Sequence, residues 1–322
     1  MRAWPRAALA LGPALGGRVR AATLRAGKQK APVRVAAKAA RGGQGGGAGG
    51  ADRTLRRAAG ELKVLQALQG HHRLPRLLGV CLDGEGEGLF VLTALVEGPG
   101  GAGGKADLAS LLRPRPRLGP AGTVRALADA AEGLAFVHAR RYAHGDVKPA
   151  NVLVSRAGAG VLCDLGSAFL DLADAAADAP SPRGPPRASP KRSPTPRQGG
   201  SAAYMSPEAW MGRPGRAADV YSLGVSLWEA AAGRPPWAGV SDVEICSRVL
   251  AAGRGGGGGG GQWALGPEHL GAWERWRGVL QVLIDATTRP RPEARVQAAE
   301  AAAALAHLAA EMEAAAVLSG NP

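Results

Sequence analysis

The chain has 322 residues, 46% of them hydrophobic, with 49 glycines, 24 prolines and a formal net charge of +14. The hydrophobic fraction is enough to bury a sizeable core, so a wholly disordered chain is excluded and one or two domains are expected. Residues 1–51 and 179–198 contain no acid and together carry +15, which leaves the rest of the chain at −1. Because the basic charge is local, a continuous groove for nucleic acid is disfavoured.

The first hundred residues are predicted to mix strands with one helix. Apolar and charged residues alternate around residues 18–20 and 33–35, which indicates strands. A helical face follows, formed by Leu55, Ala58, Leu62, Leu65 and Leu68. Glycine-rich stretches at 42–50, 98–104 and 253–261 are predicted to be flexible connections.

The second part of the chain is predicted to be mainly helical. Apolar residues recur at helical spacing in residues 123–138 and 220–232 and in the alanine-rich tail, 296–317. Charged residues such as Glu300 and Glu311 interrupt that tail, so no transmembrane segment is expected. The Ser, Pro and Arg-rich segment at about 175–198 is predicted to be a disordered surface insert.

The cysteines and the N-terminus bear on the compartment. Three cysteines without a Cys-x-x-Cys pair indicate neither a disulfide framework nor a zinc site: Cys81, Cys163 and Cys246. The Arg-rich, acid-free N-terminus is similar to an organelle transit peptide, but residues 11–38 are needed by the predicted fold. A cytoplasmic location is the expectation, with organelle targeting left open.

A polar motif stands at residues 144–151, which read HGDVKPAN. A short apolar strand follows, and Asp164 comes thirteen residues after Asn151, within the sequence CDLG. An ordinary acidic turn before a buried strand is the alternative, but four polar residues at this spacing disfavour it. The pattern resembles the catalytic loop and magnesium-binding motif of the eukaryotic protein kinase family.

The resemblance implies an α+β fold of two lobes within one kinase domain over residues 1–322. The β-rich N-lobe, with one main helix, is expected at about 1–96, and the mainly helical C-lobe at about 97–322. Phosphoryl transfer depends on positioning and charge neutralisation more than on covalent chemistry, which explains the residue types in the motif.

The resemblance also implies a role for each polar residue of the motif. Asp146 accepts or orients the substrate hydroxyl proton, and Lys148 faces the transferred phosphoryl group. Asn151 and Asp164 hold the Mg²⁺ ions that bridge the phosphates of ATP.

Two charged residues upstream fit the same reaction. Lys38 ends the strand sequence VAAK and is expected to bind the α and β phosphates, held by an ion pair with Glu61. Asp52 is the only other acid between Lys38 and Cys81, and it adjoins a glycine tract. Either charge taken alone reads more simply as a solvated surface residue, but their order before the catalytic loop favours function.

The loop expected to cover the phosphates departs most from the family. Residues 12–19 match its glycine pattern at Gly12, Gly17 and Val19, with Ala14 in place of the second glycine. Glycines there let backbone amides approach phosphate closely, so the methyl group of Ala14 is expected to weaken nucleotide binding without abolishing it. The alternative is a plain glycine-rich turn.

Downstream, residues 199–208 resemble the end of the kinase activation segment, where Ser201 would bond the catalytic Asp and Lys. Residues 219–229 resemble the buried central helix, whose first Asp ties down the catalytic-loop backbone. Glu208 is expected to pair with an arginine near the end of the domain, either Arg289 or Arg291.

These features predict a serine/threonine protein kinase that uses ATP and Mg²⁺ on protein substrates, most like the tyrosine-kinase-like group. Pro13, Ala14 and Gly145 motivate the alternative of a pseudokinase or scaffold. Gly145 replaces the arginine that usually pairs with a phosphate on the activation loop. Ser-Pro and Thr-Pro pairs within 181–196 predict an upstream proline-directed kinase as a partner. A nucleic-acid partner is not expected, because the basic N-terminus lacks interleaved aromatic residues.

Overall fold

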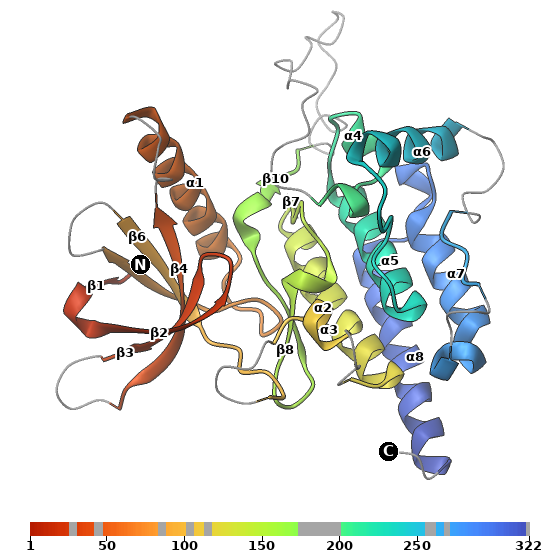
Figure 1. The fold of residues 1–322 in the computed structure, drawn as a ribbon, viewed down its shortest axis with the longest axis horizontal. Helices are drawn as coiled ribbons and strands as arrows, with labels where there is room; N and C mark the ends of the chain where they lie inside the picture. The colour runs from red at the N-terminus through yellow and green to blue at the C-terminus, as the bar shows by residue number, and fades with distance from the viewer. Residues whose placement is uncertain are drawn as a thin grey trace, which may run out of the picture.

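The computed structural model describes residues 1–25, 31–41, 48–82, 88–100, 106–112, 118–172, 201–254, 262–266 and 271–319. A β-sheet with helix α1 forms one lobe and a group of helices forms the other (Figure 1). The prediction of a two-lobed α+β fold is therefore confirmed. The predicted insert at about 175–198 lies outside the described residues.

The N-lobe sheet has six strands in the order β1-β5-β6-β4-β3-β2. Their bounds are Ala3–Trp4, Leu9–Gly16, Val19–Leu24, Val33–Arg41, Leu77–Leu82 and Gly88–Ala94, for β1 to β6. β1 pairs with β5 in parallel, and the other neighbours are antiparallel. The sequence periodicity indicated β3 and β4, whereas β1 is too short to produce a periodic pattern.

Helix α1, Ala48–Ala67, carries the buried apolar face that the sequence predicted, including Leu62 and Leu65. The helix begins inside the glycine tract 42–50, and α6, Asp242–Arg254, ends inside the tract 253–261. The prediction that these tracts are entirely unstructured is wrong at those two ends. Burial of an apolar face outweighs the cost of about 1 kcal/mol for each glycine in a helix.

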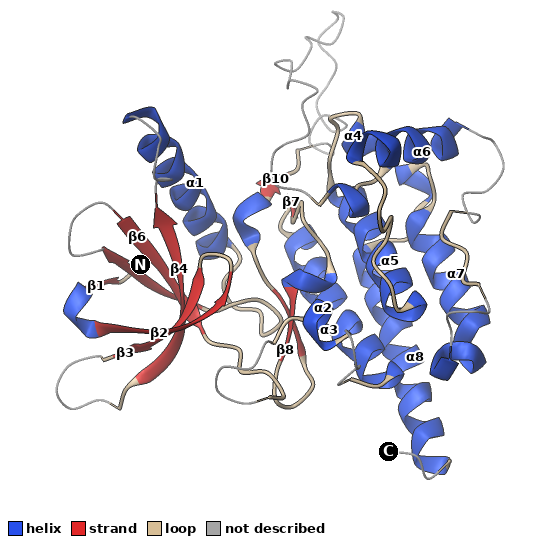
Figure 2. Ribbon diagram, viewed as in Figure 1, coloured by secondary structure: helices blue, strands red, loops and turns tan. Residues whose placement is uncertain are grey.

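The C-lobe is mainly helical (Figure 2). Its core contains α5, Arg216–Ala232, most of whose residues are buried. The other helices are α2 (Leu108–Leu111), α3 (Pro120–Ala139), α4 (Pro207–Trp210), α7 (Arg277–Thr288) and α8 (Ala298–Leu318). Short strands follow α3 and precede α4 along the chain: β7 (Tyr142–Ala143), β8 (Val152–Val154), β9 (Gly160–Leu162) and β10 (Phe169–Leu170). A helix buried on all sides is the natural centre of such a core.

Helix α8 is long and apolar enough, by length and composition, to cross a membrane. In this fold α8 packs along α3, and Leu305, Leu308 and Met312 are buried in the C-lobe core. Arg125 of α3 also makes an ion pair with Glu313 of α8 at 2.8 Å. The packing accounts for the apolar side of α8, and the absence of a transmembrane segment stays a prediction.

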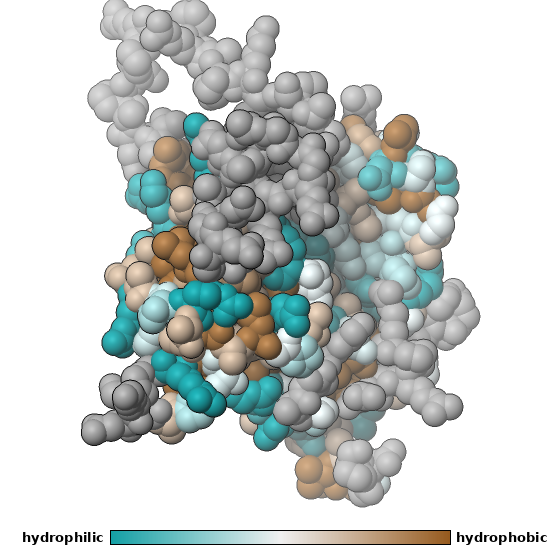
Figure 3. Space-filling model, turned by 60° about the vertical axis from the view of Figure 1, so that its left-hand side comes forward, coloured by the Kyte–Doolittle hydropathy of each residue, from teal (hydrophilic) through white to brown (hydrophobic). Residues whose placement is uncertain are grey.

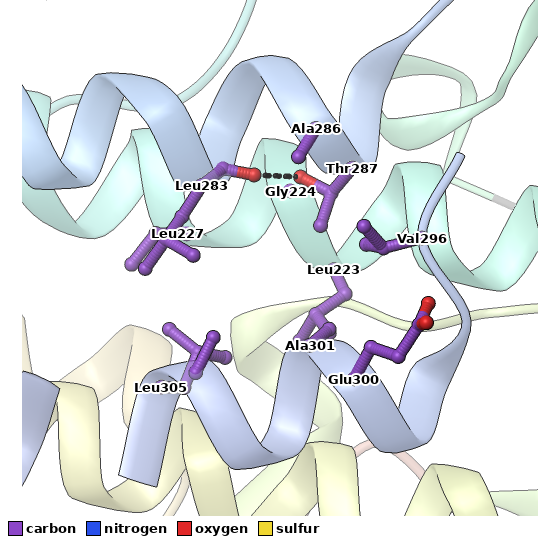
Figure 4. Close-up of a pocket in the computed structure, with 11 residues that line it drawn as sticks. Leu223, Gly224, Leu227, Leu283, Ala286, Thr287, Val296, Glu300, Ala301 and Leu305 are labelled. Carbon is purple, nitrogen blue, oxygen red and sulfur yellow. Dashed lines mark hydrogen bonds between the residues drawn. The ribbon is translucent and has the colours of Figure 1, made fainter. Parts of the chain in front are cut away.

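A hollow between α5, α7 and α8 encloses about 350 Å³ of empty space, part of it open to solvent (Figure 4). Gly224 lets α5 approach α7, since a Cβ there would lie 2.1 Å from Thr287 Oγ1. That hydroxyl donates to the Leu283 carbonyl at 2.8 Å. The lining is mainly apolar, so the hollow is a feature of helix packing and offers little chemistry.

Candidate active site

Lys38 stands at the centre of a charge cluster that three elements bring together. Lys38 lies on β4, Glu61 on α1 and Asp164 just after β9. Lys38 Nζ donates to Glu61 Oε1 at 2.8 Å and to Asp164 Oδ1 at 2.6 Å. The expected pairing of Lys38 with Glu61 is therefore present, and Asp164 joins it.

Electrostatics stabilise the charged forms in this cluster. Burial alone would lower the pKa of Lys38, but the charges of Asp164 and Glu61 raise that pKa above its ordinary value. Burial alone would raise the pKa of Asp164, but Lys38 holds that pKa below its ordinary value. Asp164 also has a left-handed backbone, with φ of 61°, which is uncommon outside glycine and typical of functional sites.

The catalytic-loop motif forms a second cluster around the carboxylate of Asp146. Lys148 Nζ donates to Asp146 Oδ2 at 2.7 Å and to Ser201 Oγ at 2.8 Å. Asn151 Nδ2 donates to the same Asp146 oxygen at 3.0 Å, and the Ser201 backbone N–H donates to Oδ1 at 3.2 Å. Ser201, far along the chain, thus reaches the Asp and Lys that the sequence predicted it would bond.

The backbone of the catalytic loop is fixed by a buried carboxylate of α5. Asp219 accepts from the backbone N–H groups of His144 at 2.7 Å and Gly145 at 2.8 Å. Asp219 Oδ2 also lies 2.9 Å from His138 Nε2, a contact that the sequence did not predict. The sequence offered one indication of this contact: His138 is the last residue of the periodic segment 123–138, which comes shortly before the catalytic loop. Charge-assisted bonds of this kind hold a loop tightly.

Gly145 adopts a backbone conformation that leaves no room for an arginine. Its φ is 78°, and a Cβ there would lie 2.8 Å from the Ser167 carbonyl oxygen. Any side chain would require the segment after Asp164 to move. The close packing of the catalytic loop against the segment after Asp164 therefore excludes an arginine at position 145.

The glycine-rich segment forms the hairpin of β2 and β3 beside Lys38. Val19 is the register partner of Lys38, and the Ala39 N–H donates to the Arg18 carbonyl at 2.9 Å. Pairing of β2 with β3 is irregular on both sides of Ala14. The turn uses the positive φ of Gly17, 51°, whereas a Cβ on Gly12 would lie 3.1 Å from the Ala21 carbonyl oxygen.

The partner of Glu208 differs from the prediction. Arg295 makes a two-pronged ion pair with Glu208, at 2.6 Å and 2.9 Å, and its side chain is 0% exposed. The expectation of Arg289 or Arg291 is wrong: the Arg289 guanidinium instead donates to the Ala294 carbonyl. A short 3-10 helix at Pro292–Ala294 turns the chain and carries Arg295 inward. A turn of three residues is too short to produce a periodic pattern, so the sequence did not indicate that Arg295 would face Glu208.

Basic side chains of the N-terminal window lie around the hairpin. Arg18, Arg20 and Arg34 are exposed, and Arg34 pairs with Glu97. On the N-lobe side of the molecule, hydrophilic side chains alternate with hydrophobic ones (Figure 3). Part of the local basicity thus lies in the segment 18–34, which includes β3 and the start of β4, the strand of Lys38.

A thiol also adjoins the cluster. Burial raises the pKa of Cys163 to about 12, and the Cys163 carbonyl lies 2.9 Å from His144 Nε2. A thiol with such a pKa stays protonated at neutral pH, so it does not act as a nucleophile. Its backbone instead helps to join the catalytic loop to Asp164.

Comparison with known proteins agrees with this geometry. The family model described as protein kinase domain matches residues 17–304. The chain is similar to the serine/threonine-protein kinase PkaA of Streptomyces coelicolor, 36% identical over 172 residues, covering 52% of this chain and 27% of that protein. It is 36% identical over 140 residues to PknA of Corynebacterium glutamicum, covering 43% of this chain and 26% of PknA. With PknB of Mycobacterium tuberculosis it is 35% identical over 127 residues, covering 39% and 18% of the two chains.

Proposed function

We propose that this chain, which belongs to the protein kinase family, transfers the γ-phosphoryl group of ATP to serine and threonine hydroxyls of proteins. The observation that carries the proposal is the set of bonds that Lys148, Asn151 and Ser201 make to Asp146. A positioned carboxylate beside a fixed ammonium group is what phosphoryl transfer to a hydroxyl requires.

Each residue of the Asp146 cluster has a separate task in this proposal. Asp146 orients the attacking hydroxyl and accepts its proton. Lys148, held by both Asp146 and Ser201, presents positive charge where negative charge develops during transfer. Because these bonds fix the Asp146 carboxylate and the Lys148 ammonium group relative to one another, both groups are positioned for the reaction.

The residues present fit ATP with Mg²⁺. Asn151 and Asp164 offer oxygen donors, the ligand type that Mg²⁺ prefers. The Asn151 amide nitrogen donates to Asp146, which leaves its amide oxygen as the ligand atom. Lys38 would bind the phosphates, oriented by Glu61. When bound, Mg²⁺ would neutralise phosphate charge, and this chain would supply the positions of the groups around it.

The substrate class follows from the sequence DVKPAN, with Lys148 two residues after Asp146, and from Ser201. The similar proteins named above are serine/threonine-protein kinases, although the chain spans about a quarter or less of their length. Membership of the tyrosine-kinase-like group is a finer proposal, supported by the resemblance of the catalytic loop and of residues 220–237 to that group. Proline-directed modification within 181–196, a cytoplasmic location and the lack of a nucleic-acid partner stay predictions.

The test is transfer of labelled phosphate from ATP to a generic basic protein by the purified chain. Asp146→Asn is expected to lower kcat by about a thousandfold, in the range of positioned acid–base groups. Asp164→Ala and Lys38→Met should abolish detectable transfer, whereas Asp285→Asn, on remote α7, should leave it unchanged. Wild-type transfer no greater than that of Asp164→Ala, with nucleotide still bound, would establish the pseudokinase alternative. Phosphotyrosine in the product would contradict the substrate class.

A further inference from the structure

The segment after Asp164 is attached to the C-lobe at a point that the proposed reaction does not use. β10 pairs antiparallel with β7, through Phe169 opposite Ala143 and Leu170 opposite Tyr142. The next backbone N–H, of Asp171, donates to the Arg141 carbonyl at 2.7 Å. The start of the activation segment thus runs beside the chain that enters the catalytic loop.

The side chain of Asp171 secures this attachment to α5. Asp171 Oδ2 accepts from the Arg216 backbone N–H at 3.0 Å and from Arg216 Nε at 3.3 Å. The Asp171 side chain is 12% exposed, so solvent screens these contacts only weakly. Gly215 makes the approach possible, because a Cβ there would already lie 3.1 Å from that oxygen. A carboxylate at the first turn of a helix is also favoured by the helix dipole.

The same end of α5 therefore holds both loops of the site. Arg216, the first residue of α5, holds the activation segment, and Asp219, one turn further on, holds the catalytic-loop backbone. Gly145 offers no guanidinium for a phosphate on the activation segment, and the Ser167 carbonyl occupies the space that a side chain would need. The fixed carboxylate of Asp171 supplies negative charge at the segment without any modification.

We propose that Asp171 is a positioning residue that, through Arg216 and the first turn of α5, keeps the start of the activation segment in its working place without a phosphate–arginine contact. The inference rests on the proposed kinase function. Asp171 acts through the backbone of β10 and touches no reacting atom. Its loss should lower kcat and leave ATP binding unaffected, because the Lys38 cluster is anchored separately on β4 and α1.

The kinetic test compares variants of the full chain. Asp171→Ala is expected to lower kcat roughly tenfold or more, the scale of a small misplacement in a site, with KM for ATP within twofold. Asp171→Asn keeps an acceptor oxygen and should fall between Ala and wild type, and Arg216→Lys should retain most activity. Glu313→Ala removes the ion pair to Arg125 and serves as the matched control with unchanged kcat. An unchanged kcat in Asp171→Ala would overturn the proposal.

Two further measurements separate this inference from the function on which it rests. Wild-type enzyme stripped of phosphate by a phosphatase should keep its kcat, and a tenfold loss would overturn phosphate independence. Amide hydrogen exchange needs no activity: Asp171→Ala should speed exchange in residues 168–172, and Glu313→Ala should not. Unchanged exchange there would overturn the anchoring role even if the wild-type chain transferred no phosphate.

Discussion

The catalytic loop and the glycine-rich hairpin lie on the two lobes of one site, yet they are held in different ways. Asp219, 2% exposed, fixes the loop backbone at His144 and Gly145 through bonds of 2.7 and 2.8 Å. In the hairpin, Ala14 and Gly17 are exposed, and the pairing of β2 with β3 is irregular. Buried charged groups fix the catalytic loop, whereas the hairpin is held by strand pairing and by an exposed hydrogen bond from Arg20 Nε to the Gly12 carbonyl at 2.9 Å.

This difference follows from what each region handles in the proposed reaction. A base must be held within a few tenths of an ångström of its productive place. A loop that covers a nucleotide has to admit and release it, and such segments come from the less stable parts of a fold. Substitutions in the C-lobe network should therefore cost much, and those in the hairpin little.

The largest effect is expected from breaking the buried pair of Arg295 and Glu208. Arg295→Ala leaves the Glu208 carboxylate buried without its partner, which should lower the free energy of unfolding by about 3–5 kcal/mol. Urea unfolding measures the loss. Arg125→Ala, which removes a half-exposed pair with Glu313, should cost less than about 1 kcal/mol. Equal losses in both variants would contradict the larger contribution of the buried ion pair.

A smaller effect is expected when Asp219, which fixes the backbone of the catalytic loop, loses its charge. Asp219→Asn keeps the shape of the side chain but removes the charge that two backbone N–H groups share, so the loop shifts. We expect kcat to fall about a hundredfold, as for misplacement of a catalytic group. Steady-state kinetics with saturating ATP measure it, and Asp285→Asn is the control. A kcat within threefold of wild type would show that backbone packing alone positions the loop.

Substitutions in the glycine-rich hairpin should change the kinetics only slightly. Ala14→Gly removes a methyl group from the expected phosphate-covering turn, so we expect KM for ATP to fall roughly two- to fivefold with kcat unchanged. Ala10→Gly, at an exposed position of the same strand, should not change KM. An unaltered KM in both variants would mean that the turn does not contact the phosphates.

The smallest effect concerns pH. The lowered pKa of Asp164 contributes stability above its ordinary value of 3.8, and this is lost as pH falls through the folded value. The raised pKa of Lys38 contributes stability below 10.5, and this is lost as pH rises past the folded value. In Lys38→Met the cation that lowers the Asp164 pKa is gone and burial alone raises that pKa, so the advantage in Tm of wild type over the variant should shrink as pH falls into the acid range. An advantage in Tm that does not change with falling pH would contradict the role of Lys38 in lowering the Asp164 pKa.

The sequence predicted local elements better than distant partners. Lys38, Asp146 and Asp164 stand in motifs whose spacing is visible along the chain. The structure brings Lys38 beside Glu61 and Ser201 beside Asp146 and Lys148, as expected, whereas the contact of Asp164 with Lys38 was not predicted. The partner of Glu208 depends on a short turn at residues 292–294, which spacing alone does not specify. Asp171 had no motif at all, because its partner on α5 is brought close only by tertiary packing.

Strand β1 has a consequence for how copies of this chain behave together. Its two residues pair in parallel with Val80 and Cys81, and the Val80 N–H donates to the Arg2 carbonyl at 3.0 Å. Without them, β5 would present bare hydrogen-bonding groups at the sheet margin, where strands of other molecules can add. Pairing of β1 with β5 covers these groups and thus disfavours self-association of the chain through this edge.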